Sequence, residues 1–199
     1  MRVHMMIAAI LLTPVVAYAQ ATSGAQAGMT AAAGAHASTP IPSNFTAAGR
    51  AQLKATYARA RQEHVPEAVI ASRVAEGEAK HASERAVVTS AAKVETNMES
   101  ARGAMMAAGR HPTDDEVRAS AYAMDRGVTK AQIVAMARRT PSDRSLAVAF
   151  DAVTGLNQNG VQLNRALTEV QAKLDAHASD AAITSLVTQA KAGVKLGGG

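Results

Sequence analysis

Cysteine and tryptophan are absent from this 199-residue sequence, and aromatic residues make up only 3% of it. Without cysteine, the chain can have no disulfide framework and no lipid attached to an N-terminal cysteine. The shortage of aromatic rings leaves little for the base stacking by which proteins bind single-stranded nucleic acid, so we expect no nucleic-acid partner. A folded core has to be built from aliphatic side chains and alanine, which favours helices that approach each other closely.

Long apolar runs are absent as well. The run from Met5 to Val16 is shorter than the about 20 residues that a membrane-spanning helix needs. It follows Arg2 and precedes an Ala-Tyr-Ala site ending at residue 19, an order typical of a secretory signal peptide. We therefore predict that residues 1–19 are a signal peptide cleaved near Ala19-Gln20, which would make the protein periplasmic or secreted. An N-terminal anchor helix is the alternative.

Charged residues are missing from residues 20–44, which consist mainly of Ala, Gly, Ser, Thr, Gln and Pro. This composition predicts a flexible linker. Residues 45–192 instead place aliphatic residues at helical spacing and show no alternating strand pattern. The clearest amphipathic pattern is Leu163, Leu167, Val170 and Leu174. We predict an all-α domain over 45–192, followed by a flexible Gly-rich tail over 193–199.

Two helix starts stand out in the middle of the chain. Thr113 with Glu116, and Thr129 with Gln132, each fit a capping box, in which the hydroxyl and the Glu or Gln side chain bond reciprocally to free backbone N–H groups. Before each start we expect a residue in the left-handed conformation that closes the preceding helix. The same pattern recurs along the chain, and the predicted turn residues are His64, His81, His111, Gly127, Gly160 and His177.

The spacing of these turns suggests repetition. They form three pairs 16 or 17 residues apart, and the pairs follow one another at about 48 residues. Periods of 20–50 residues are typical of helical repeats. We predict a single right-handed α-solenoid-like domain of about nine short helices, in three degenerate repeats of three helices each.

The turn histidines His64, His81, His111 and His177 could bind a metal ion or sense pH. However, glycine fills the same slot at Gly127 and Gly160, and no pair of histidines has the spacing that places two ligands on one helix face. We interpret the histidines as structural and predict no metal site.

Acidic residues cluster at Asp114, Asp115 and Glu116, and again at Glu76 and Glu78. The first cluster could be half of a carboxylate pair or a cation site, but it also fits the first turn of a helix, where negative charge is favourable. The second is interpreted as a solvated helix end, although it could serve as acid and base if a cleft closed over it. We predict no catalytic or cofactor-binding residue.

Candidate interaction residues come from two short segments. Arg138, Arg139 and Arg144 form the densest basic patch of a chain whose net charge is +5. Met105 and Met106 are adjacent flexible apolar residues, which more often fill a core but can face a partner.

The combined pattern predicts an exported bacterial envelope protein that acts as a non-enzymatic helical-repeat interaction or scaffold module. The expected partner is a protein or peptide of the envelope, with weak contact to its anionic surface. A hydrolytic periplasmic helical enzyme and a protein that binds anionic surfaces are the alternatives.

Overall fold

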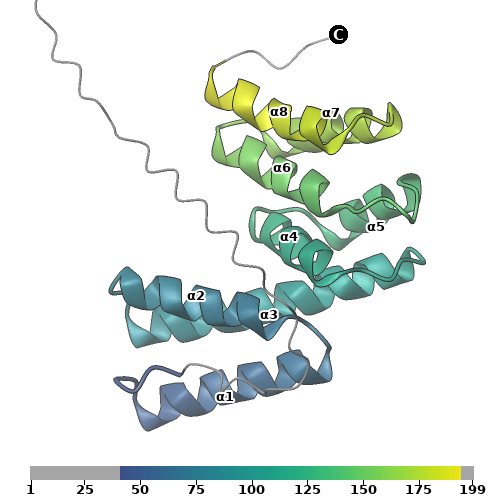
Figure 1. Ribbon diagram of the computed structural model, residues 1–199. Helices are drawn as coiled ribbons and strands as arrows, with labels where there is room; N and C mark the ends of the chain where they lie inside the picture. The colour runs from purple at the N-terminus through teal and green to yellow at the C-terminus, as the bar shows by residue number, and fades with distance from the viewer. Residues whose placement is uncertain (1–40, 194–199) are drawn as a thin grey trace, which may run out of the picture. The chain divides into compact units, whose positions relative to one another are not determined.

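A computed structural model describes residues 41–193, and these residues form eight α-helices and no strand (Figure 1). The all-α prediction is confirmed. The helices are α1 Ala47–Gln62, α2 Glu67–Ala79, α3 Glu84–Ala107, α4 Asp114–Asp125, α5 Lys130–Arg139, α6 Ala147–Gln158, α7 Leu163–Asp175 and α8 Asp180–Lys191.

The described residues all belong to one compact unit. The predicted signal peptide lies outside the described residues, as do nearly all of the predicted linker and tail. No helix between residues 41 and 193 combines the length and the apolar character that a membrane crossing requires.

Both predicted capping boxes are present. Thr113 Oγ1 accepts from the Glu116 N–H at 3.3 Å while Glu116 accepts from the Thr113 N–H at 2.9 Å. Thr129 and Gln132 make the same reciprocal pair at the start of α5. These caps fix the first turns of α4 and α5 because they satisfy N–H groups that have no partner inside the helix.

Left-handed backbone occurs at five of the six predicted turn residues. The angle φ is +53° at His64, +52° at His81 and +53° at His177, and it is positive at Gly127 and Gly160. The prediction for His111 is wrong, because Gly109 closes α3 with φ +82°. His111 precedes Pro112, and the residue before a proline is restricted to extended backbone.

Helix α3 is one 24-residue helix, longer than the short helices that the sequence predicted. No glycine or proline interrupts Glu84 to Arg102, so nothing in this stretch ends the helix. Gly103 lies on the surface with open space around its Cα and is tolerated within the helix. The estimate of about nine helices is therefore wrong for the described residues.

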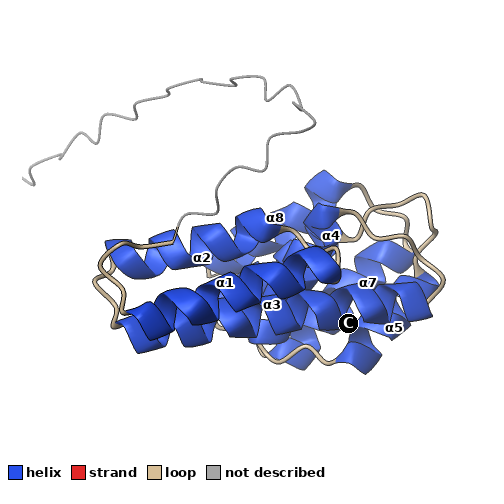
Figure 2. Ribbon diagram, turned by 90° about the horizontal axis from the view of Figure 1, so that it is seen from below, coloured by secondary structure: helices blue, strands red, loops and turns tan. Residues whose placement is uncertain are grey.

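Helix α3 also joins two apolar clusters. Residues up to Met98, such as Val87 and Val94, belong to a cluster with α1, α2 and part of α4, whereas Ala104 and Met105 belong to a second cluster with α4 to α8. In Figures 1 and 2, α3 extends alongside helices of both groups. The core is aliphatic, as the composition predicted, with Tyr57 and Phe150 as its largest buried side chains.

Glycine sets the separation of two helix pairs. A Cβ on Gly77 of α2 would lie 2.6 Å from Val87 Cγ2 of α3, and a Cβ on Gly155 of α6 would lie 2.9 Å from Val187 Cγ1 of α8. Both distances are shorter than van der Waals contact, so the valines pack directly over the glycine backbone. Close approach of this kind compensates for the scarcity of large side chains.

Candidate interaction groove between α5 and α7

A groove of about 500 Å³ lies between α5 and α7. Two turns of α5 form one wall and α7 forms the other. The lining residues are Gln132, Ala135, Met136 and Arg139 from α5, and Asn164, Leu167, Thr168, Gln171, Ala172 and Asp175 from α7. We name this the α5/α7 groove.

The middle of the groove is apolar with polar, uncharged walls. Met136 is buried and Leu167 half-buried, and the alanines at 135 and 172 are exposed. Gln132 uses its Oε1 in the capping box, where it accepts from the Thr129 N–H at 2.8 Å, so its Nε2 remains a donor. Groups of this kind can bind a neutral polar ligand without a charge being buried.

One end of the groove carries an ion pair. Arg139 Nη2 lies 2.7 Å from Asp175 Oδ2, and Gln171 Nε2 donates to Asp175 Oδ1 at 2.7 Å. The two charged side chains are 60% and 42% exposed, so the pair contributes little to stability. Its effect on the groove is that the two charges cancel, and the lining as a whole is neutral.

The other predicted interaction residues lie elsewhere. Arg138 is exposed and, together with Arg139, lines a separate depression beside Gly109 and Ser142. Arg144 Nη2 donates to the Ala178 carbonyl and to Asp180 Oδ1, so it holds the start of α8 in place. The structure therefore keeps Arg138 and Arg139 together and leaves Arg144 out of their depression.

The two predicted methionines differ in their exposure to solvent. Met106 is 53% exposed, whereas Met105 is fully buried in the second apolar cluster. The prediction that Met105 faces a partner is wrong, since consecutive helix positions lie about 100° apart and α4 to α6 cover one of them.

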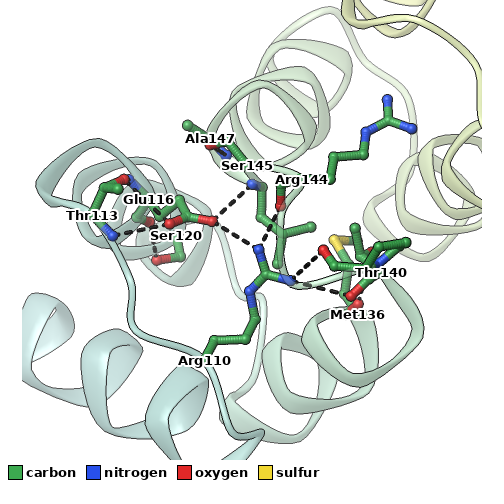
Figure 3. A network of polar contacts seen from close by, with 11 residues as sticks. Arg110, Thr113, Glu116, Ser120, Met136, Thr140, Arg144, Ser145 and Ala147 are labelled. Atoms are coloured by element: carbon green, nitrogen blue, oxygen red, sulfur yellow. Dashed lines mark hydrogen bonds and ion pairs between the residues drawn. The ribbon is translucent and has the colours of Figure 1, made fainter.

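A buried polar network, which we call the Arg110–Glu116 clasp, joins α3, α4, α5 and α6 (Figure 3). Arg110 Nη1 donates to the Thr140 and Pro141 carbonyls at 3.1 and 2.9 Å, and Nη2 donates to Glu116 Oε1 at 3.2 Å and to the Arg144 carbonyl. Both charged side chains are nearly inaccessible, at 6% and 4% exposure. The clasp fixes the long connection between α5 and α6.

Glu116 also caps a second helix. Its Oε1 accepts from the Leu146 N–H at 2.9 Å, at the start of α6, beside Ser145 Oγ, which accepts from the Ala147 N–H at 3.2 Å. Burial alone would raise the pKa of Glu116, but the backbone N–H groups of Thr113 and Leu146 and the Arg110 guanidinium together lower it. The acidic cluster at 114–116 is thus part of the scaffold.

The turn histidines lie on the surface, and Glu76 of the acidic pair at 76–78 is bonded to basic side chains. The four predicted turn histidines are all exposed, and no group of three or more His, Cys, Asp or Glu within residues 41–193 is arranged to hold a metal ion. Glu76 bonds to Arg73 and Lys80, and the Lys80 hydrogen bond is the main reason that its pKa is lowered.

Sequence reasoning missed nearly all of the groove. Gln132 was identified only as a cap and Leu167 only as part of an apolar stripe, while Asn164, Thr168 and Gln171 carried no signal. These residues come together only because α5 and α7 lie side by side. Local sequence patterns do not encode that arrangement. Comparison with protein-family models, with curated proteins and with solved structures finds no match.

Proposed function

We propose that the chain is a non-enzymatic helical-repeat interaction module, and that its α5/α7 groove binds an extended, uncharged peptide segment of a partner protein. The observation that carries this proposal is the lining of the groove. It combines an apolar floor with amide and hydroxyl groups, and its only charged groups neutralise each other.

An extended peptide suits this lining better than a compact ligand does. Gln132 and Arg139 are seven positions apart, about 10 Å along a helix, which is the length of about three extended residues. Peptide backbone groups need hydrogen-bond partners when they leave water, and the side-chain amides of Gln132 and Asn164 can supply them. A charged residue over the middle of the groove would lose hydration without gaining a counter-charge.

The repeat part of the proposal is supported by a spacing of 33 residues. Gly127, Gly160 and Gly193 all have positive φ, and the buried residues Val117, Phe150 and Ile183 follow one another at the same interval. A two-helix unit of this length fits the helix bounds better than the expected 48-residue unit of three helices. We propose an α-solenoid-like arrangement of such pairs.

The two terminal helices agree with this arrangement. The exposed residues of α1 include Ala47, Ala51 and Lys54, and those of α8 include Thr184 and Thr188. Helical arrays need terminal helices with small or polar outer faces, because nothing stacks on them. We further propose, on the residue pattern of 1–19, that the module is exported and that its partner belongs to the cell envelope.

Selection of binding peptides tests the groove. We expect a random peptide library displayed on phage to yield sequences with an uncharged stretch of about three residues. Ala135→Glu should weaken their binding by roughly tenfold or more, because it places a charge and added bulk in the groove. The affinities are measured by titration calorimetry.

The matched control is Ala131→Glu, on the same helix, exposed and outside the groove lining. It should bind the selected peptides as the unaltered chain does. Failure to enrich any peptide, or equal affinity of the two variants, would overturn the proposal.

A further inference from the structure

Helix α1 repeats the sequence pattern of α5. Residues 51–59 and 131–139 share one pattern. Each segment begins with Ala-Gln and an aliphatic residue, has Ala at its fifth position and Thr or Met at its sixth, and ends in Arg. The burial matches as well: Leu53 and Ile133 are completely buried, and Ala55 and Ala135 are exposed. The two helices therefore present the same outward row of Gln, Ala and Arg.

A second groove, of about 410 Å³, lies along this row in α1. Gln52, Ala55, Thr56 and Arg59 line it at the positions that Gln132, Ala135, Met136 and Arg139 occupy in the α5/α7 groove. We name it the α1/α3 groove.

The opposite walls also correspond. In α3 the wall contains Val88 and Thr89, followed by Ala92. In α7 it contains Leu167, Thr168 and Ala172. The alanine follows the aliphatic residue by five positions in α7 and by four in α3. Both grooves therefore pair an aliphatic residue and a threonine on one wall with a glutamine and an alanine on the other.

The arginine that ends each row has an acidic partner, but Asp175 lines the α5/α7 groove and is 42% exposed, whereas Glu95 is 1% exposed and lies outside the α1/α3 lining. Arg59 Nη2 lies 3.3 Å from Glu95 Oε2, and Arg139 Nη2 lies 2.7 Å from Asp175 Oδ2; in both pairs the acid follows the arginine by 36 positions. The arginines are 56% and 60% exposed, so each groove ends at a guanidinium that is open to solvent on one side. The groove walls between Gln52 and Arg59 carry no other charge.

We propose that the α1/α3 groove is a second binding site for the ligand class of the α5/α7 groove, so that each chain binds two extended, uncharged peptide segments. The inference rests on the proposed function of the α5/α7 groove. It is carried by the recurrence of the same side chains in the same order along α1 and α5, with a threonine and an aliphatic residue on the facing wall of each groove. The floors differ, since Thr56 replaces Met136, and the α1/α3 groove accordingly suits a more polar central side chain.

The test is an NMR titration of the isotope-labelled chain with the synthetic peptide acetyl-Ala-Thr-Ala-Thr-Ala-Thr-amide. We expect two groups of shifted backbone amides, one near Thr56 and Thr89 and one near Met136 and Thr168. Ala55→Glu should weaken binding to the first group roughly tenfold or more and leave the second unchanged, and Ala135→Glu should do the reverse. The same peptide with glutamate in place of threonine should shift neither group.

Each outcome is decisive. Shifts confined to the α5/α7 groove would overturn the second site and leave the proposed function intact. Shifts near neither groove would overturn both the second site and the proposed function for this ligand class. If the shifts in both groups disappeared together in Ala55→Glu, the two grooves would act as one joint site. That result would contradict the proposal of two independent sites. Both alanines are exposed on helix surfaces, and glutamate is a good helix former, so the variants should fold.

Discussion

Replacing Glu116 with alanine is expected to lower the free energy of unfolding by about 3–5 kcal/mol. The change leaves the Arg110 guanidinium, which is only 6% exposed, without its carboxylate partner. It also removes the acceptor for the N–H groups of Thr113 and Leu146, so the starts of α4 and α6 both lose a cap. Urea unfolding followed by circular dichroism would measure the loss.

The control for this variant is Asp114→Ala. Asp114 lies in the same first turn but is exposed, so it contributes only through the helix dipole, and its loss should cost less than about 1 kcal/mol. Similar losses for the two variants would show that the clasp does not hold the fold together.

The same carboxylate makes stability depend on pH. Its pKa in the folded chain is below the ordinary value of 4.5, so the folded state favours the ionised form. The stabilisation is complete above pH 4.5 and is lost as the pH falls through the lowered pKa. The Glu116→Gln variant should therefore be less stable than the unaltered chain at neutral pH, and the difference should shrink in acid.

The second large effect is expected at a turn. Gly127 has φ +101°, a conformation that a β-branched residue adopts only at high cost, and a Cβ there would also touch Leu163 Cδ2 at 3.4 Å. Gly127→Val should therefore lower the free energy of unfolding by about 1–3 kcal/mol. The shift of the urea midpoint provides the measurement.

His81→Gly is the matched variant. His81 has φ +52° and is exposed, so glycine relieves the left-handed strain while it gains conformational freedom in the unfolded state. These two effects nearly cancel, and the stability should change by less than about 1 kcal/mol. If valine at 127 proved as harmless as glycine at 81, the assignment of left-handed turns would be incorrect.

Local chemistry explains which parts of the fold were predictable. The caps at Thr113 and Thr129 and the left-handed turns depend on residues close in sequence, and the structure has them as predicted, except at His111. That exception is local as well, because the restriction imposed by Pro112 outweighs the tolerance of histidine for positive φ. Helix α3 is longer than the short helices that the sequence predicted, because no glycine or proline stands between Glu84 and Arg102.

Tertiary contacts explain what was missed. Met105 and Met106 are indistinguishable in sequence, and only the packing of α4 to α6 decides which one is buried. Arg144 belongs to a basic patch in the sequence, but in the fold it bonds to the start of α8. Each groove depends on two helices that are not consecutive in the chain, so its walls could be matched only after the helices had been placed.

Site-specific photo-cross-linking in intact producing cells tests the central claim most directly. A photoreactive amino acid at position 135 should give a cross-linked adduct with a partner protein, and one at position 131, on the same helix but outside the groove, should give none. Mass spectrometry of the adduct should locate the bond in an uncharged segment of the partner. Adducts of equal yield from both positions, or none from position 135, would contradict the claim that the α5/α7 groove is the binding site.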